Sequence, residues 1–102
     1  MSNVKTKNIA QGNRLFMLGQ VAATPGALDL VERTETNVID LLHRHQHGDW
    51  GSVPAEDAEE NARSIEDGCR ILSSYFLNAD ERVWIITEAD RSMTTLLLPD
   101  EY

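Results

Sequence analysis

The sequence predicts a single α+β domain, with two or three N-terminal helices packed on a three- to four-stranded antiparallel sheet. The chain has 102 residues, which suits one domain with a modest core. Its last third, Arg70–Tyr102, holds three strand-like runs separated by short polar turns, and apolar residues recur at helical spacing before it. Residues 1–14 are polar and lack the apolar run of a targeting signal, so we expect a flexible tail followed by one domain over residues 15–102.

The first elements of the domain are a strand and a helix. Leu15–Ala23 is apolar and ends at a turn signal, which favours a buried strand that joins the sheet, although a glycine and a glutamine interrupt it. Thr24 and Pro25 mark a helix start, because a threonine hydroxyl can cap free N–H groups and proline at the first position loses no hydrogen bond. We therefore expect a short helix over Pro25–Arg33.

Two further helices are expected before the strand-like runs. Thr36 is a candidate cap for a helix that continues to about Gln46 and ends near Gly48. One face of this helix gathers four residues at three- and four-residue spacing, which are Val38, Leu41, Leu42 and His45. The next helix ends at Gly68, and its narrow apolar stripe comprises Ala55, Ala58, Ala62 and Ile65. Acidic residues near the start of this helix suit the positive end of its dipole.

The C-terminal third reads as an antiparallel meander. Its strands are expected at about Arg70–Leu77, Arg82–Glu88 and Met93–Leu98, with turns at Asn78–Glu81 and Ala89–Ser92. The two turns set the register, and the register decides which side chains share a face of the sheet.

Symmetrical turns would pair Tyr75 with Trp84. Ser73 would then pair with Ile86, and Ile86 with Thr95. The predicted core face comprises Leu72, Phe76, Val83, Ile85, Leu96 and Leu98, with Arg70, Ser74, Thr87 and Thr94 towards one end. The opposite face comprises Ile71, Ser73, Tyr75, Trp84, Ile86, Glu88, Met93, Thr95 and Leu97. This second face is too apolar to be left in water, so we expect a homodimer or another protein partner to cover it, unless it is a ligand site or an internal core.

The charge of the chain argues against several functions. Nine basic and seventeen acidic side chains give a net charge of −8, which repels nucleic acid and anionic membranes and suits a basic or neutral partner. Cys69 is the single cysteine, so no internal disulfide is expected and a reducing, cytoplasmic location is favoured. No metal or other cofactor is predicted, because His43, His45 and His47 alternate and would diverge around a helix.

Several residues allow both a structural and a functional interpretation. His45 is either a packed core histidine or a group presented to a cleft, and Trp50 is either a plug at one end of the core or a lid over a ligand. Glu88, Asp90 and Arg91 cluster at the second turn of the meander, where either an Asp side chain stabilises the turn by bonding its own backbone or the cluster carries chemistry. Arg70 begins the strand that carries Ser73. The sequence contains no P-loop, dinucleotide fingerprint, nucleophile elbow or zinc-protease motif.

Three strings carry a resemblance to a known family. They are Gln20–Ala27 (QVAATPGA), Arg44–Gly51 (RHQHGDWG) and Trp84–Pro99, which contains WIITEADRS and TTLLLP. The chain resembles, over nearly everything after the tail, a family of small uncharacterised proteins carried on plasmids and integrative or conjugative elements of Gram-negative bacteria. The resemblance implies a role in a mobile genetic element and assigns no catalytic residue.

A looser similarity concerns layout alone. Helices followed by an antiparallel sheet with polar residues resemble the barnase, RelE and colicin-type ribonucleases, which cleave RNA without metal. That analogy implies proton transfer by His45 or Glu88, and phosphate binding by Arg70 or Arg91. Because the chain is acidic, we instead expect a noncatalytic interaction protein, with a metal-independent ribonuclease or other small hydrolase as the alternative. The expected binding residues are Ser73, Tyr75, Trp84, Ile86, Thr95 and Trp50.

Overall fold

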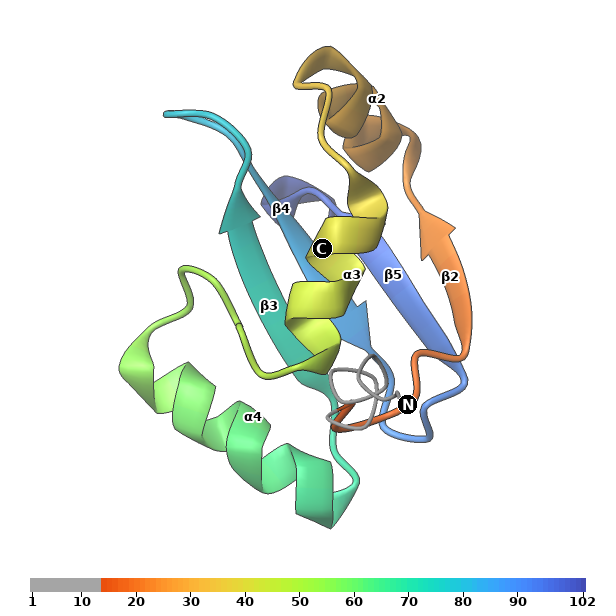
Figure 1. Ribbon diagram of the computed structural model, residues 1–102, viewed down its shortest axis with the longest axis vertical. Coiled ribbons are helices and arrows are strands. Elements are labelled where there is room, and N and C mark those ends of the chain that lie inside the picture. Colours follow the sequence, from red (N-terminus) through yellow and green to blue (C-terminus); the bar gives the residue numbers. More distant parts are fainter. Residues whose placement is uncertain (1–13) are drawn as a thin grey trace, which may run out of the picture.

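Within the part of the chain that the structure describes, the sheet is mixed, with one parallel and two antiparallel strand pairs. A computed structural model describes residues 14–102, so the predicted tail lies outside the described residues except for Arg14. The described elements are β2 Gln20–Ala23, α2 Pro25–Arg33, α3 Val38–Gln46, α4 Ala55–Asp67, β3 Ile71–Phe76, β4 Arg82–Thr87, β5 Met93–Leu97 and the 3₁₀ turn η1 Pro99–Glu101. The four strands lie in the order β2-β5-β4-β3 (Figure 1).

The α+β class is confirmed, and the expectation of a purely antiparallel sheet is wrong. β2 runs parallel to β5, whereas β3, β4 and β5 form the predicted antiparallel meander. A parallel pair needs a long crossover connection. Here the crossover contains the three helices and two strands of the meander, so the helices lie between β2 and β3 instead of forming an N-terminal block.

The first strand is shorter and more exposed than predicted. The sequence predicts a buried strand over Leu15–Ala23, but β2 begins at Gln20, and only Ala23 of its four residues is partly buried. Gly19 has φ +67°, a left-handed conformation that breaks the extended backbone immediately before the strand. The glycine that interrupts the apolar run therefore marks the start of the strand.

The helix boundaries follow local signals in the sequence. Thr24 caps α2, accepting a hydrogen bond from the backbone N–H of Ala27, as predicted. Asn37, and not Thr36, caps α3 through its side-chain oxygen. Gly68 ends α4 in a left-handed conformation, as the sequence predicts.

The buried side of α4 differs from the predicted alanine stripe. Asn61 and Ser64 are its buried residues, while Ala55 and Ala62 are exposed. The Asn61 amide donates to the Leu72 carbonyl at 2.7 Å and accepts from the Leu72 N–H at 3.1 Å. The helix therefore satisfies the edge of β3 with a side-chain amide, and only Ala58 and Ile65 of the predicted stripe are half-buried.

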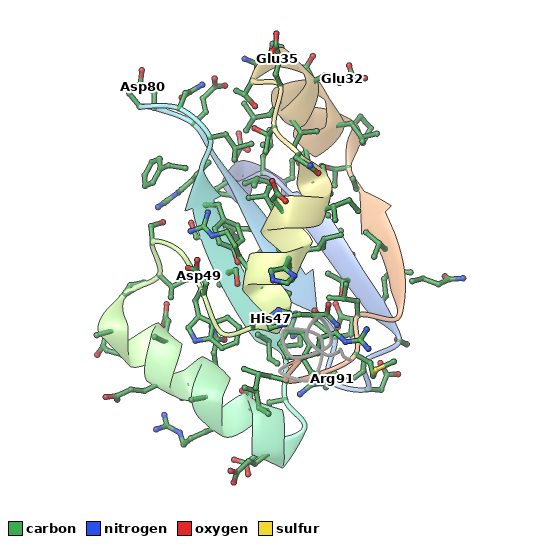
Figure 2. The ribbon with its side chains drawn as sticks, viewed as in Figure 1. Glu32, Glu35, His47, Asp49, Asp80 and Arg91 are labelled. Atoms are coloured by element: carbon green, nitrogen blue, oxygen red, sulfur yellow. The ribbon has the colours of Figure 1, made fainter. Side chains whose placement is uncertain are left out.

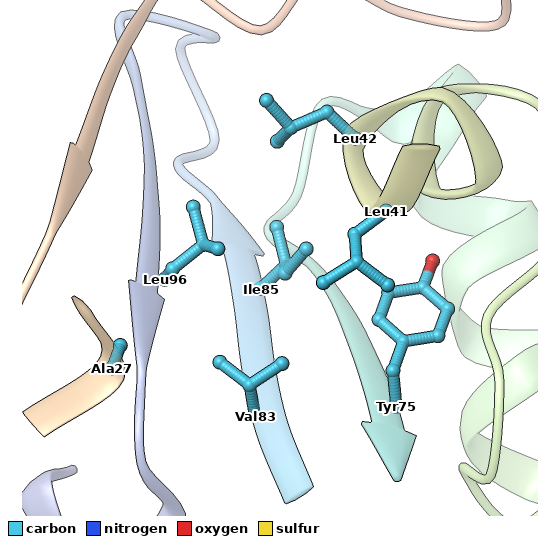
Figure 3. Close-up of a cluster of buried hydrophobic side chains, with 7 residues drawn as sticks. All are labelled: Ala27, Leu41, Leu42, Tyr75, Val83, Ile85 and Leu96. Atoms are coloured by element: carbon cyan, nitrogen blue, oxygen red, sulfur yellow. The ribbon is translucent and has the colours of Figure 1, made fainter. Parts of the chain in front are cut away.

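The core lies between α3 and one face of the sheet, which we call the inner face. Figure 3 shows Leu41 and Leu42 of α3 above side chains from β3, β4 and β5. The cluster comprises Ala27, Leu41, Leu42, Tyr75, Val83, Ile85 and Leu96. Tyr75 belongs to this core, so the sequence placed it on the wrong face.

The register between β3 and β4 explains that error. Phe76 pairs with Arg82, and Ser74 pairs with Trp84, so the pairing differs by one residue from the prediction. Five residues connect the two strands, and the Asn78 side-chain oxygen accepts from the N–H groups of Asp80 and Glu81 inside that connection. A shift of one residue moves every side chain of β3 to the other face. The second hairpin has the predicted register, with Ile86 opposite Thr95.

Candidate functional site

The candidate site is the face of the sheet opposite α3, which we call the outer face. Its residues on the three meander strands are Leu72, Ser74, Phe76, Arg82, Trp84, Ile86, Met93, Thr95 and Leu97. Phe76 is 54% exposed and Met93 is 37% exposed, while Ile86 and Leu97 form a buried floor. An apolar surface with aromatic residues therefore lies on the side of the sheet that α3 does not cover.

Two adjoining hollows lie on the outer face and share Leu72 and Trp84. The first has a volume of about 270 Å³ and is lined by Arg70, Leu72, Trp84, Ile86 and Tyr102. The second has a volume of about 210 Å³ and is lined by Ser52, Val53, Pro54, Asp57, Leu72, Ser74, Arg82 and Trp84. Because Trp84 lines both hollows, it is the central aromatic residue of the outer face.

The C-terminal residue rests on one part of this face. The Tyr102 ring meets Trp84 edge to face, with 5.7 Å between ring centroids and an interplanar angle of 65°. The Arg70 guanidinium donates to the Tyr102 hydroxyl at 3.2 Å. Tyr102 is itself 68% exposed, so it borders this part of the face and does not close it.

Two arginines of the outer face have no acidic partner within the described residues. The guanidinium of Arg82 lies 5.5 Å from the centroid of the Phe76 ring, and Arg70 contacts Tyr102. Neither forms an ion pair with a carboxylate of residues 14–102, although Asp57 lines the same hollow as Arg82. By contrast, Arg33, Arg44 and Arg63 all form ion pairs. The outer face thus carries two arginines that no carboxylate of residues 14–102 pairs with, on an acidic protein.

The predicted binding residues lie in three separate places. Trp84, Ile86 and Thr95 lie together on the outer face, whereas Ser73 and Tyr75 point into the core on the inner face. Trp50 is also away from the outer face: it is half-buried beside Phe16 and His45, as a plug at one end of the core.

Sequence reasoning missed four contributors to the outer face, which are Leu72, Phe76, Arg82 and Tyr102. For the two β3 residues the available signal was Asn78, because an asparagine that bonds its own following backbone favours the longer connection. Tyr102 lies beyond the strands, and no pattern in the sequence indicates that it folds back onto Trp84.

His45 is a packed core histidine and is not presented to a cleft. Its side chain is fully buried, with Nδ1 2.6 Å from the Ser73 hydroxyl and Nε2 2.9 Å from the Thr87 hydroxyl. Thr87 lies 2.7 Å from Thr94, whose hydroxyl donates to the carbonyl of Leu18 at 2.7 Å. Burial lowers the pKa of His45 to about 4, so the ring is neutral at pH 7.

The direction of this hydrogen-bond chain follows from its last acceptor. A carbonyl can only accept, so Thr94 gives its one proton to Leu18 and must accept from Thr87. Thr87 then accepts from Nε2–H of His45, and the unprotonated Nδ1 accepts from Ser73. Each hydroxyl group and ring nitrogen in this hydrogen-bond chain therefore has a partner inside the protein. This arrangement orders the core and leaves Ser73 closed to substrate, because its side chain is fully buried.

Arg91 is held by backbone carbonyls. Its guanidinium donates to the carbonyl oxygens of Ser64, Cys69, Glu88 and Ala89 at 2.7–3.3 Å. Figure 2 shows Arg91 at the end of the sheet where β4 turns into β5. The side chain thus joins the end of α4 to the β4–β5 turn. Glu88 lies at the start of the same turn, where its backbone N–H donates to Met93.

The residues expected to carry ribonuclease chemistry do not converge. His45 is in the core, Arg91 binds carbonyls at the turn, and Arg70 lies beside Tyr102 on the outer face. Within residues 14–102, no group of three or more His, Cys, Asp or Glu side chains could hold a metal ion. The rings of His43 and His47 stack at 4.1 Å between centroids, and Cys69 is exposed. No helix in the described part of the chain is long and apolar enough to cross a membrane.

Compared with known proteins, the chain matches no protein-family model, no curated protein and no solved structure.

Proposed function

We propose that this protein is a noncatalytic interaction protein of a mobile genetic element, and that it binds a protein partner through the outer face. The observation that carries the proposal is an apolar hollow centred on Trp84 and bordered by arginines without acidic partners among residues 14–102. Tryptophan and arginine are the residue types most often found as energetic anchors of interfaces.

The chemistry of the face favours an apolar segment that also carries carboxylates. An aromatic or aliphatic side chain would fill the space between Leu72 and Trp84, and an acidic group would pair with Arg70 or Arg82. The net charge of −8 predicts a basic or neutral partner for the molecule as a whole, but Arg70 and Arg82 have no ion-pair partner within residues 14–102 and can each pair with a carboxylate. Such pairs act at short range, because interactions of exposed charges are screened over about 8–10 Å in physiological salt.

The geometry gives less support to the ribonuclease alternative. A general base must reach the proton that it removes, and His45 is fully buried with both ring nitrogens hydrogen-bonded. A phosphate-binding arginine needs free donors, and the Arg91 guanidinium already serves four carbonyls. These contacts favour the noncatalytic proposal.

A peptide-display selection against the purified protein tests this proposal. We expect enrichment of sequences that combine an aromatic or large aliphatic residue with Asp or Glu. Binding of a selected peptide should weaken by roughly 30-fold in Trp84→Ala, since truncating an anchor of an interface typically costs about 2 kcal/mol. Arg70→Gln should weaken the binding of acidic peptides more than the binding of neutral ones.

Ile39→Ser is the matched control, because Ile39 is 69% exposed on α3, the helix that covers the opposite face of the sheet. This variant should bind the peptide as the unmodified protein does. The proposal fails if no peptide is enriched, or if the Trp84 and Ile39 variants bind alike.

A further inference from the structure

The two edges of the sheet differ in whether their outward backbone groups have hydrogen-bond partners. At the β3 edge, Asn61 satisfies the N–H and the C=O of Leu72. The next outward-facing residue, Ser74, donates its N–H to the Trp50 carbonyl at 3.0 Å and accepts from the Ser52 N–H at 2.7 Å. This edge is therefore closed to pairing with another strand along these residues.

Within residues 14–102, nothing pairs with the β2 edge. Gln20 and Thr24 donate their N–H groups inward, to Ser92 and Leu96 at 3.0 Å each. Because backbone groups alternate in direction along a strand, Val21 and Ala23 direct their N–H and C=O groups away from β5. No hydrogen bond from residues 14–102 reaches these outward groups.

The composition of β2 also leaves the edge unprotected. Natural edge strands are commonly protected by being very short, or by charged residues, proline or a bulge, and of these devices β2 has only its short length of four residues. β2 has the sequence QVAA, with no charge and no proline, and its side chains are small. They present little steric obstacle to a neighbouring strand.

An apolar groove runs along the open edge. It has a volume of about 290 Å³, and its lining includes Val21 and Ala23 of β2, Leu28 and Val31 of α2, and Val38 of α3. Val21 is 47% exposed and Leu28 is 51% exposed. A strand added beside β2 would gain backbone hydrogen bonds and would also cover these side chains.

We propose that β2 pairs antiparallel with β2 of a second copy of this chain, about a twofold axis through Ala22. In that register Val21 lies opposite Ala23 of the partner subunit, and Ala23 lies opposite Val21 of the partner subunit. Each of these two pairs forms two backbone hydrogen bonds, one from each N–H to the carbonyl of the residue opposite. The four-stranded sheets of the two copies then form one continuous sheet. Val21 and Ala23 point to the inner face, so Leu28 of each copy helps to cover the groove of the other.

A second copy fits this edge better than a flexible peptide. Four residues offer few backbone bonds, and a peptide would lose conformational entropy on binding to them. A folded copy presents a strand that is already ordered and contributes its own apolar groove. This dimer does not depend on the outer face, so the two proposals can fail separately.

Sedimentation of the full chain up to high micromolar concentration tests the dimer. The unmodified protein should form dimers, and Val21→Pro should be monomeric with an unchanged circular dichroism spectrum. Proline removes only an outward-facing N–H at this position, which edge strands tolerate. Val21→Thr keeps both the shape and the N–H and should remain dimeric, as should Trp84→Glu on the outer face.

Hydrogen exchange gives a readout that misfolding of the proline variant cannot imitate. In the unmodified protein, the amides of Val21 and Ala23 should become protected as concentration rises, while the amide of Met17 should not. The proposal is overturned if the protein is monomeric throughout, if these two amides exchange equally fast at all concentrations, or if Trp84→Glu but not Val21→Pro separates a dimer.

Discussion

At the residue scale, His45 couples the stability of the core to pH. The folded pKa is about 4, below the ordinary value of 6.5, because burial disfavours the charged ring. The unfolded chain therefore binds a proton between these values while the folded protein does not. The resulting stability is fully present above pH 6.5 and is lost as the pH falls towards 4.

We expect the free energy of unfolding to fall by about 3 kcal/mol between pH 7 and pH 4 from this group alone, as 1.36 kcal/mol per pKa unit implies. Urea titrations at several pH values measure this slope. His45→Gln, which removes the buried ring, should flatten this slope. A stability that is flat from pH 6.5 to 4.5 would show that His45 is not held neutral.

Arg91 illustrates how one residue type allows two interpretations until its contacts are known. An arginine at a turn beside Glu88 suits either phosphate binding or turn stabilisation. Its guanidinium bonds four carbonyls, and its own backbone has φ +61°, an uncommon conformation for a residue with a side chain. The sequence contains the arginine, but the carbonyls that it binds come from separate segments.

At the element scale, the loop between α3 and α4 acts as a partial fifth strand. Gly51, whose φ is +75°, forms an isolated parallel bridge with Ser74 at the edge of β3. A Cβ atom at Gly51 would collide with the carbonyl of Ser74 and the ring of Tyr75. Glycine is needed here both for its backbone conformation and for close approach.

Two glycine substitutions separate these requirements. Gly68 has a similar φ of +74°, but a Cβ atom there meets nothing within 4 Å. We expect Gly68→Ala to cost about 1 kcal/mol for the left-handed conformation alone. Gly51→Ala should cost about 3 kcal/mol or more, since it also breaks backbone hydrogen bonds to β3. Thermal and urea unfolding measure the difference, and equal costs would show that the loop does not contact β3 in solution.

One additional residue in the β3–β4 connection changes the face of the sheet on which every side chain of β3 lies. Alternation alone could not identify the buried face of β3, because both of its faces carry apolar and polar residues. Tyr75 and Phe76 are adjacent aromatics, and the structure buries the first and exposes the second. Only the length of the β3–β4 connection decides which of the two is buried. For this reason the prediction of the binding face is right for Trp84 and wrong for Tyr75.

At the scale of the whole molecule, the acidic charge should exclude RNA. Figure 2 shows Glu32, Glu35 and Asp80 at the end of the molecule opposite Arg91, and the net charge is −8. We expect no binding of a fluorescent single-stranded RNA in anisotropy measurements at low salt, and no cleavage in the presence of EDTA, because an RNA-binding surface normally needs a positive groove.

A matched pair of variants makes the cleavage assay decisive. Glu88→Gln changes the candidate proton-transfer residue, and Glu56→Gln changes an exposed carboxylate in the first turn of α4. Metal-independent cleavage that is lost in Glu88→Gln and kept in Glu56→Gln would overturn the noncatalytic proposal. No activity in any of the three proteins is the expected result.

The sequence by itself determined what depends on neighbouring residues. The α+β class, the capped start of α2, the end of α4 at Gly68 and the register of the β4–β5 hairpin all follow from contacts between residues close in the chain. Tertiary structure alone decided the parallel pairing of β2 with β5, the buried amide of Asn61, and the return of Tyr102 to Trp84. Each of these joins segments that lie apart in the chain, and their pairing is set by the packing of the assembled core, which no local pattern encodes.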